Sequence, residues 1–414
     1  MSDERAMERR DFLSCMAWTG TGLVWTLAGG VPRSRSLGPR TAEAAEDGSW
    51  SFVQISDTHI GFKGGANPDA LGTFQAALAR IKAMDPKPAF LIHTGDITHA
   101  QKPGAFDTVT EALKGVGVER TFYVPGENDV FADGGTEYLG RFAGGGRGWQ
   151  SFDYRGVHFV GLVNVLNLKA GGLGSLGAEQ IAWLAKDVKG LKSSTPIVLF
   201  AHVPLWTVYP EWGWGTDDSE AALALVKRFG SVTVLNGHIH QIMQKVEGSV
   251  SFHTAMSTAF PQPAPGTAPS PGPMKVAPEK LKSVLGIADV TFIPGRKSLA
   301  VVDATLSGEP PAFGTVVGSA SEKRPARSGT RAPNEIGIDN FQFTPPTLEV
   351  KAGTRVAWVN DDDVPHLIAS SAGKFKSSQV LDTGGRFELT LAKAGTYPYF
   401  CSLHPKMQGT IVVT

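Results

Sequence analysis

Cysteine is scarce in this sequence of 414 residues, which contains only Cys15 and Cys401. Cys15 lies in an N-terminal stretch with the character of a removable export signal, so the mature protein would hold one cysteine and no internal disulfide. An unpaired thiol in an exported protein calls for a special explanation. Metal ligation by Cys401 supplies one.

The sequence also lacks an excess of one charge and a second long apolar segment. Its 39 acidic and 39 basic side chains cancel, so nothing indicates a broad basic surface for nucleic acid. Beyond the N-terminal stretch, no segment reaches the length of a membrane span. We therefore expect a globular protein with no nucleic-acid partner and no membrane span once the signal is removed.

The first 44 residues resemble a twin-arginine export signal. Arg9 and Arg10 begin the motif, an apolar stretch follows over residues 12–31, and Ala42-Glu43-Ala44 offers a small-x-small cleavage site. This route moves proteins that are already folded, which suits a metalloprotein. An uncleaved anchor is the alternative interpretation. The prediction is a periplasmic or otherwise exported protein.

The rest of the chain divides at a segment poor in large apolar residues. Residues 306–334 are rich in Gly, Pro, Ser and Ala, which is the composition of a linker. This predicts two folded domains, residues 49–305 and residues 335–414. A second run rich in Pro and Gly, residues 261–273, is predicted to be a long surface loop of the first domain.

The first domain alternates apolar strands with helical patterns. Strands are expected at residues 51–55, 89–93, 121–124, 196–200 and 232–235, and helices at about 68–84, 106–115, 177–189 and 219–228. This alternation predicts an α/β fold with buried sheets.

Polar motifs follow these strands at the points where each one ends. They are Asp57-Thr58-His59, Gly95-Asp96, Gly126-Glu127-Asn128-Asp129, Ala201-His202 and Gly237-His238-Ile239-His240. Open α/β sheets place their ligands beyond these strand ends. Each motif alone is weak, but five in this order indicate a two-metal site. In such a site carboxylates and imidazoles hold two ions about 3.5–4 Å apart, and a bridging water becomes a hydroxide that attacks phosphorus in line.

On these motifs, residues 49–305 resemble the calcineurin-like metallophosphoesterases. The resemblance implies two central β-sheets flanked by helices, two ions of Fe, Mn or Zn, and a small phosphomonoester or phosphodiester substrate. It assigns the first ion to Asp57, His59, Asp96 and His240. It assigns the second to Asp96, Glu127, His202 and His238, with Asp96 bridging.

The third motif departs from the family pattern G-N-H-D. Glu127 stands at the position of the ligand Asn, and Asn128 at that of a His that stabilises the transition state or protonates the leaving group. Asn128 can donate a hydrogen bond but cannot transfer a proton. An alignment slipped by one residue, with Asn128 as the ligand, is the alternative. Asn128 and the bridging Asp96 are the candidate catalytic residues.

Near the C-terminus, the loop of residues 401–407 carries a thiolate (Cys401), an imidazole (His404) and a thioether (Met407). Together with His366 upstream, this is the ligand set of a mononuclear blue-copper site. Soft sulfur and imidazole suit copper in both oxidation states, and a distant thioether tunes the reduction potential.

Residues 335–414 resemble a cupredoxin of the amicyanin and pseudoazurin branch. The residues that carry the resemblance are 341–345, 349–354, 356–360, 365–366 and 395–397, which lead into the loop at Cys401. It implies an all-β Greek-key sandwich and one copper ion held by His366, Cys401, His404 and, axially, Met407.

The remaining histidines have weaker assignments. His93 and His99 flank the Gly95-Asp96 motif and are either structural or orient metal ligands. His99 is also a candidate for the missing proton donor. His158 and His253 lie in predicted strands and are expected to be structural.

Two further groups allow two interpretations each. Trp206, Trp212 and Trp214 follow His202 and either line the substrate pocket or pack over its rim. The three aspartates at 361–363 are expected to form a solvated turn, or else to favour docking of a basic redox partner protein.

Three functions remain open on the sequence. The first is an exported phosphoesterase with an attached electron-transfer domain, favoured by the metal-ligand motifs. The second is a periplasmic copper-binding or electron-transfer protein whose phosphoesterase domain is weakly active or inactive, favoured by Asn128. The third, a pure recognition module, has no positive support.

Overall fold

The computed structural model describes residues 22–28, 31–37, 48–296, 299–311, 331–362 and 364–414. The twin-arginine pair, Cys15 and the predicted cleavage site lie outside these residues, so the export signal stays a prediction. Strands β1 (Gly22–Ala28) and β2 (Val31–Leu37) pair as an antiparallel hairpin. Within the described part of the chain, no helix combines the length and the apolar character required to cross a bilayer.

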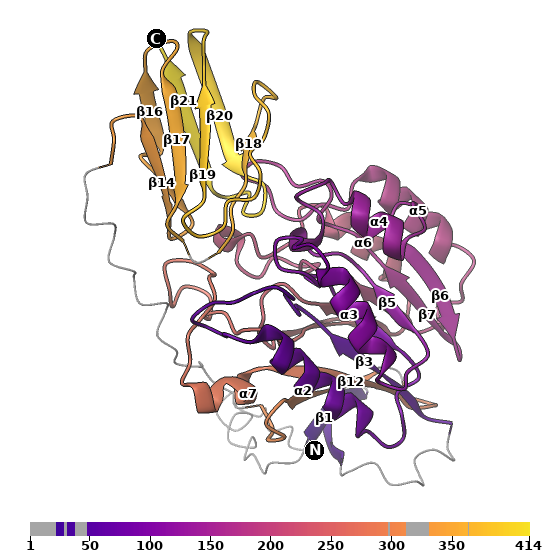
Figure 1. Ribbon diagram of the computed structural model, residues 1–414. Coiled ribbons are helices and arrows are strands. Elements are labelled where there is room, and N and C mark those ends of the chain that lie inside the picture. The colour runs from indigo at the N-terminus through magenta and orange to yellow at the C-terminus, as the bar shows by residue number, and fades with distance from the viewer. Residues whose placement is uncertain (1–21, 29–30, 38–47, 297–298, 312–330, 363) are drawn as a thin grey trace, which may run out of the picture.

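Two β-sheets form the centre of the first domain (Figure 1). The five-stranded sheet has the order β13-β12-β3-β4-β5, with β3 (Trp50–Ile55), β4 (Leu91–His93), β5 (Thr121–Tyr123), β12 (Gly286–Phe292) and β13 (Ala300–Thr305). The six-stranded sheet has the order β10-β11-β9-β8-β7-β6, with β6 (Gln150–Tyr154), β7 (Val157–Gly161), β8 (Ile197–Phe200), β9 (Val232–Asn236), β10 (Gln244–Glu247) and β11 (Val250–Thr254). In both sheets the central strands that precede the polar motifs run parallel.

The sheets pack face to face because their strands are apolar on both sides. In β3, Trp50 and Phe52 point into a buried aromatic cluster between the sheets, whereas Val53 and Ile55 point to the opposite face. Strand β8 alternates in the same way, with Phe200 facing the aromatic cluster. Buried parallel strands are expected to show this near-continuous hydrophobicity.

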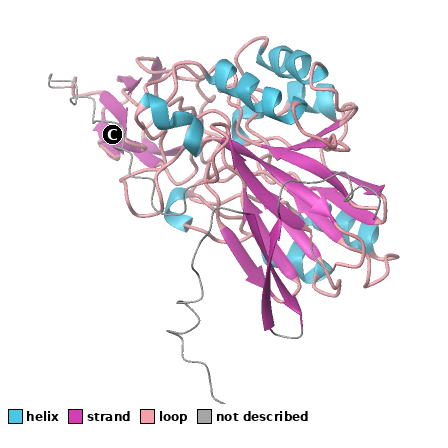
Figure 2. Cartoon of the chain, turned by 90° about the horizontal axis from the view of Figure 1, so that it is seen from below, coloured by secondary structure: helices cyan, strands magenta, loops and turns pink. Residues whose placement is uncertain are grey.

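Helices cover the two outer faces, as Figure 2 shows. Helices α2 (Ala70–Lys82), α3 (Ala105–Lys114) and α4 (Thr136–Phe142) pack on the five-stranded sheet. Helices α5 (Ala178–Val188) and α6 (Ser219–Val226) pack on the six-stranded sheet. A short helix α7 (Leu281–Val284) and the 3₁₀ turns η2 (Glu127–Asp129), η3 (Pro210–Trp212) and η4 (Pro278–Lys280) complete the domain. The predicted α/β architecture is confirmed.

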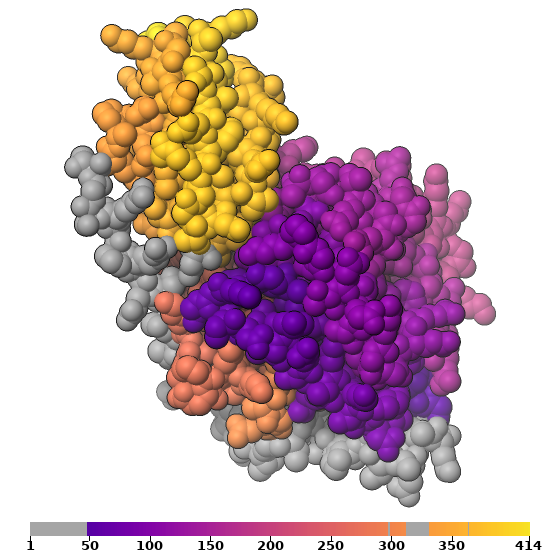
Figure 3. Space-filling model, viewed as in Figure 1, coloured from indigo at the N-terminus to yellow at the C-terminus, as the bar shows by residue number. Residues whose placement is uncertain are grey.

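The C-terminal domain is a sandwich of two four-stranded sheets. One has the order β15-β14-β17-β19, with β14 (Glu335–Asp339), β15 (Gln342–Thr344), β17 (Arg355–Asn360) and β19 (Arg386–Thr390). The other has the order β16-β21-β20-β18, with β16 (Thr347–Val350), β18 (Ile368–Ser370), β20 (Gly395–Cys401) and β21 (Gln408–Val413). Trp358 and Tyr399 are fully buried between the sheets, in T-shaped contact. The all-β prediction is confirmed, and Figure 3 shows this sandwich resting directly on the first domain.

Candidate metal centres

The polar motifs of the first domain converge because they follow parallel strands. Asp57 lies just beyond β3, Asp96 beyond β4, and η2 beyond β5 in one sheet. His202 follows β8, and His238 and His240 follow β9 in the other sheet. The carboxyl ends of these strands meet at one edge of the sandwich, as expected for ligand sites in α/β folds.

Five of the predicted ligands have a left-handed backbone that non-glycine residues seldom adopt. Their φ angles are 52° at Asp57, 40° at His59, 49° at Asp96, 71° at His238 and 54° at His240. Such residues cost about 1–3 kcal/mol each and persist only where the surrounding structure enforces them. Strain of this kind clusters at functional sites, so the backbone independently marks this edge of the sandwich.

Asp57, His59 and His240 form the first ligand cluster, and all three are buried. His240 Nε2 lies 3.3 Å from Asp57 Oδ1 and 3.2 Å from His59 Nε2. Asp96 joins this cluster, with its Oδ2 atom 3.4 Å from His59 Nε2. The three clustered side chains, with Asp96 beside His59, are the donors that the resemblance assigns to a first metal ion.

Glu127, His202 and His238 form the second cluster. Glu127 Oε2 lies 3.0 Å from His202 Nε2, and Glu127 Oε1 lies 3.1 Å from His238 Nδ1. Asp96 Oδ2 is 3.7 Å from His202 Nε2, so the Asp96 carboxylate stands between the two clusters. This donor set of carboxylates and imidazoles fits two divalent or trivalent ions sharing Asp96.

Backbone carbonyls fix the tautomers of two ligand histidines. His202 Nδ1 donates to the Thr94 carbonyl at 2.7 Å, and His240 Nδ1 donates to the Phe260 carbonyl at 2.6 Å. Each Nε2 lone pair is thereby left free for a metal ion. The Asp57 carboxylate is held in turn by the Ser56 hydroxyl and the His238 backbone N–H.

The buried carboxylates and imidazoles of the site shift one another's pKa values. Burial and the neighbouring Glu127 carboxylate raise the pKa of Asp96 well above its ordinary value. Burial alone would lower the pKa of His202, but the carboxylates of Asp96 and Glu127 outweigh it and raise that pKa. Buried carboxylates are stable when they are paired or coordinate a metal. A carboxylate with a raised pKa, such as that of Asp96, would be stabilised in its charged form by a bound cation.

The third motif places Glu127 and Asn128 in different roles. The Glu127 carboxylate faces His202 and His238, whereas the Asn128 side chain faces Asp96. Asn128 Nδ2 donates to Asp96 Oδ2 at 2.8 Å, and its backbone N–H donates to Asp96 Oδ1 at 2.9 Å. This arrangement supports Glu127 as the metal ligand and Asn128 as a residue that orients the bridging carboxylate.

Two buried residues not assigned to a metal support the ligands. His99 Nδ1 lies 3.3 Å from His59 Nδ1, and burial lowers the pKa of His99 to about 3. His93 contacts the Thr58 hydroxyl and the Gly95 backbone N–H, and burial lowers its pKa to about 3 as well. Both imidazoles are neutral near pH 7, which suits partners that orient ligands through hydrogen bonds.

The structural assignment of the other two histidines is confirmed. His158 pairs with Asp153 and Asp187 at 2.9 Å each, and His253 pairs with Asp303 at 3.0 Å. Neither residue is in the ligand clusters. Both hold strands of the domain to their neighbours.

The C-terminal domain brings three predicted copper ligands together. Cys401 Sγ lies 3.5 Å from His366 Nδ1 and 3.6 Å from His404 Nδ1, and the two Nδ1 atoms are 3.4 Å apart. This near-equilateral triangle of one sulfur and two nitrogens fits a trigonal copper site. The two imidazoles lower the pKa of the Cys401 thiol well below its ordinary value, against the effect of burial, so they favour the thiolate that copper needs.

The copper loop is fixed by its own backbone. The Cys401 N–H donates to the Met407 carbonyl at 3.0 Å, and the Met407 N–H donates to the His404 carbonyl at 2.8 Å. Met407 is buried in the same apolar cluster as Cys401. Its role as the axial ligand stays a prediction.

The predicted solvated turn at 361–363 is wrong for Asp362. Only 7% of Asp362 is exposed, and its Oδ2 atom accepts a hydrogen bond from His366 Nε2 at 2.8 Å. It also accepts hydrogen bonds from the backbone N–H groups of Asn340 and Phe341. Asp361 pairs with Arg331, and residue 363 lies outside the described chain. The sequence shows no sign of this role, because three consecutive aspartates a few residues before His366 are also typical of an ordinary exposed loop.

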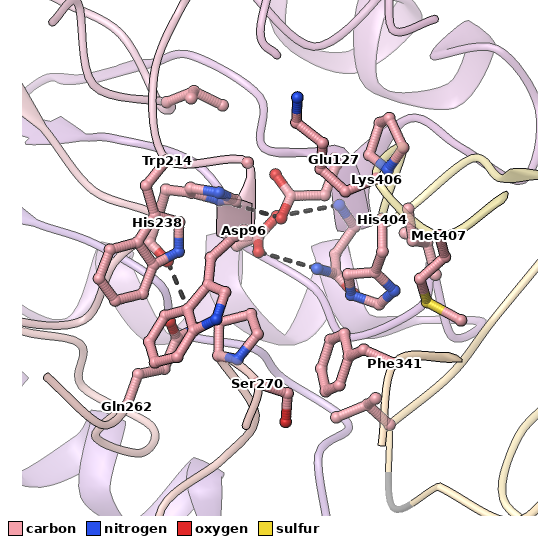
Figure 4. Close-up of a pocket in the computed structure, with 18 of the residues that line it drawn as sticks. Asp96, Glu127, Trp214, His238, Gln262, Ser270, Phe341, His404, Lys406 and Met407 are labelled. Atoms are coloured by element: carbon pink, nitrogen blue, oxygen red, sulfur yellow. Dashed lines mark hydrogen bonds and ion pairs between the residues drawn. The ribbon is translucent and has the colours of Figure 1, made fainter. Parts of the chain in front are cut away.

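One cavity of about 290 Å³ connects the two metal centres (Figure 4). Asp96, Glu127 and His238 line it from the first domain, and Phe341, His404, Lys406 and Met407 line it from the second. Trp212 and Trp214 also line it, as one interpretation of the sequence expected, whereas Trp206 packs against Phe252 instead. Sequence reasoning missed the contribution of the second domain, because no local pattern reports docking between domains.

The run at 261–273 is more than a surface loop, so that prediction is wrong in part. Pro261 and Pro263 are buried, and Gln262, Pro269, Ser270, Pro271 and Pro273 line the cavity. The run packs between the dinuclear centre and the copper domain.

Comparisons with known proteins agree with the two-domain description. The calcineurin-like phosphoesterase family matches residues 51–242, and the cupredoxin-like domain family matches residues 312–413. A 3',5'-cyclic-nucleotide phosphodiesterase of Nostoc is 25% identical over 219 residues, which are 51% of this chain and 79% of that protein. Amicyanin of Paracoccus versutus is 32% identical over 83 residues, 19% of this chain and 62% of that protein. This chain thus spans less than two thirds of that amicyanin.

Two solved structures are similar to parts of this chain. A purple cupredoxin from Nitrosopumilus maritimus is 38% identical, with a TM-score of 0.19, covering 19% of this chain and 98% of that chain. A dimetal phosphatase from Danio rerio is 15% identical, with a TM-score of 0.48, covering 62% of this chain and 96% of that chain.

Proposed function

Because the chain belongs to the calcineurin-like phosphoesterases through its first domain and to the cupredoxins through its second, we propose that it is an exported phosphoesterase that carries a blue-copper centre. Its substrate is a small phosphomonoester or phosphodiester, cut at a dinuclear site of Fe, Mn or Zn. The observation that carries the proposal is the pair of ligand clusters with the buried Asp96 carboxylate between them.

The protein's own residues account for binding and orientation. Two ions in such a site lower the pKa of a bound water and neutralise the oxygens of a phosphoryl group. Asp96 is held in one orientation by the two hydrogen bonds from Asn128. The strained backbone at Asp57, His59 and His240 presents the ligands of one cluster, and Glu127 presents a carboxylate in the other. Preorganised groups of this kind need no rearrangement during the reaction.

Protonation of the leaving group is the step with the least support. Asn128 cannot transfer a proton, and His99, whose pKa burial lowers to about 3, is neutral near pH 7 and lacks the acidic proton of an imidazolium. The site therefore suits substrates whose leaving groups depart without protonation. The Nostoc relative makes a phosphodiester the first class to test.

The copper centre supports electron transfer as the second activity. Cys401, His366 and His404 supply the trigonal donor set, and Asp362 orients His366 through its outer nitrogen. A redox partner protein would have to reach this centre. The alternative function, an electron-transfer protein with a weakly active phosphoesterase domain, is favoured by Asn128 alone.

Export through the twin-arginine route completes the proposal. Its support is the Arg9-Arg10 motif and the fit of that route to a protein that folds around metals. Replacing both arginines by lysine should leave unprocessed protein in the cytoplasm, as seen by fractionation and immunoblotting. Normal appearance of the mature form outside the cytoplasm would exclude this route.

The central test combines metal analysis with hydrolysis. The purified protein should hold two ions besides copper and should hydrolyse an aryl phosphodiester when supplied with Mn²⁺ or Fe²⁺. Asp96→Asn should lose metal and activity together, because a neutral amide cannot balance two cations. An Asp153→Asn variant is the matched control, since Asp153 pairs with His158 away from the site. Unchanged metal content and turnover in the Asp96 variant would defeat the proposal.

A further inference from the structure

The copper domain forms part of the wall around the dinuclear site. The cavity of about 290 Å³ has metal ligands of both centres on its surface. In Figure 4, Phe341, His404 and Met407 lie on one side, Trp214 and His238 lie on the other, and Asp96 and Glu127 lie between them. Its volume is at the lower end of the range for small-molecule pockets. A substrate that occupies this cavity therefore lies close to the copper domain.

Specific contacts hold the copper domain in this position. The Gly171 N–H donates to the Pro405 carbonyl at 2.6 Å, and Lys406 Nζ donates back to the Gly171 carbonyl at 2.7 Å. On a second loop, the Ser270 hydroxyl donates to Asn340 Oδ1 at 3.0 Å. These bonds involve residues that line the cavity or adjoin its lining, so the docking geometry and the pocket shape are set together.

Phe341 is the residue of the copper domain that is most clearly placed for ligand contact. Its φ is 57°, a strained conformation for a bulky side chain. Asp362 enforces this conformation by accepting a hydrogen bond from the Phe341 N–H at 2.9 Å. The ring stands edge-on to His404, with 4.6 Å between centroids, and lines the cavity. Strained backbone conformations of this kind cluster at ligand clamps. Here the strain is maintained by a buried carboxylate, and the ring of the strained residue lines a pocket.

The first domain supplies aromatic rings to the same cavity. Trp212 and Trp214 stand at 84° to one another with centroids 5.1 Å apart, and Phe260 packs on His59. Trp214 is buried, whereas Trp212 is partly exposed. The cavity thus combines a charged floor of metal ligands with aromatic rings from two domains. Aromatic walls favour planar apolar groups.

We propose that Phe341 of the copper domain is a specificity-determining residue of the phosphoesterase, contacting a planar group of the substrate. The phosphate occupies the dinuclear centre, and an aromatic or heterocyclic ester group rests among Phe341 and the tryptophans. This rests on the proposed phosphoesterase function and narrows its substrate class to phosphodiesters with a planar ester group. Lys406, which also lines the cavity, adds a positive charge that suits an anionic ligand.

The test uses the full chain and two ligands that differ in one planar group. Methyl phenyl phosphate and dimethyl phosphate carry the same charge, and each is measured as a competitive inhibitor of the hydrolysis of methyl p-nitrophenyl phosphate. Phe341→Ala should raise the inhibition constant of methyl phenyl phosphate by about 2- to 12-fold, the value of an aromatic contact, and leave that of dimethyl phosphate unchanged. Phe341→Leu keeps apolar volume without a flat ring and should show the same difference between the two esters. It replaces the alanine variant if that variant does not fold.

Phe375→Ala is the matched control, because Phe375 packs on the core of the same domain but does not line the cavity. The blue absorbance of the copper-loaded variants reports whether the domain is intact. Equal changes for both esters, or no change, in a variant that keeps its colour would overturn the proposal.

Failure of the proposed function would be recognised separately. Wild-type protein that does not hydrolyse methyl p-nitrophenyl phosphate contradicts phosphoesterase activity. In that event, calorimetric titration with phenyl phosphate and methyl phosphate tests the pocket directly. Tighter binding of phenyl phosphate that is lost in the Phe341 variants would support the inference, and equal binding of the two would overturn it.

Discussion

The two metal centres are built in opposite ways. The dinuclear centre gathers seven residues from five loops, spread from Asp57 to His240 and drawn from two sheets. The copper centre takes three of its four predicted ligands from one loop, residues 401–407. Five of the dinuclear ligands have a left-handed backbone, and none of the copper ligands does. A site assembled from distant loops depends on strain and on the whole sandwich, whereas a site on one loop depends on local hydrogen bonds.

The largest difference between the two centres should appear when the thiolate ligand of the copper centre is removed. Cys401→Ser removes the only soft thiolate of the copper site and should abolish the blue colour completely. It should leave the metal content of the dinuclear centre unchanged, because Cys401 is buried within the second domain. Absorbance spectra and metal analysis of the same sample measure both effects. Retained colour after the substitution would contradict the copper assignment.

A smaller effect, on the hydrolysis rate, is expected from a substitution at Asn128, where the family pattern has a histidine. Asn128→His should restore a proton donor and raise the hydrolysis rate of esters with poor leaving groups by up to roughly 10²–10⁴-fold. Rates with good leaving groups should change little, since these groups depart without protonation. A series of phenols of rising pKa measures the slope. If the natural protein already cuts good and poor leaving groups equally, another residue supplies the proton.

The smallest effect is expected from Asp362, which contacts a predicted copper ligand without being one itself. Asp362→Asn removes the charge that orients His366 and should weaken copper binding by about 10- to 100-fold, as is typical for such partners. The blue colour of the fully loaded protein should remain, because all ligands stay in place. Competition with a copper chelator measures the affinity. Asp361→Asn is the control, since Asp361 pairs with Arg331. Equal affinities for both variants would mean that Asp362 has no special role.

The contrast between local and distant contacts also explains which features could be predicted from the sequence. Strands such as β3 and β8 were predictable because both their faces are apolar, and the motifs after them follow from strand order. The copper loop was predictable because its ligands are neighbours in sequence. Asp362 and Phe341 were not predicted in their roles, because these depend on a carboxylate buried by tertiary packing and on the docking of one domain against another.

The side chain of Phe131 has a consequence for how this protein can be divided. Phe131 lies just after the turn that carries Glu127, donates its N–H to the Glu127 carbonyl, and packs against the apolar cluster of the copper domain. Fragments cut within residues 306–334 would each expose an apolar surface that the intact chain covers. Such halves are expected to associate when mixed, and a phosphoesterase half expressed alone would lose a support beside one of its metal ligands. The packing of Phe131 thus ties the turn that carries Glu127 to the core of the copper domain.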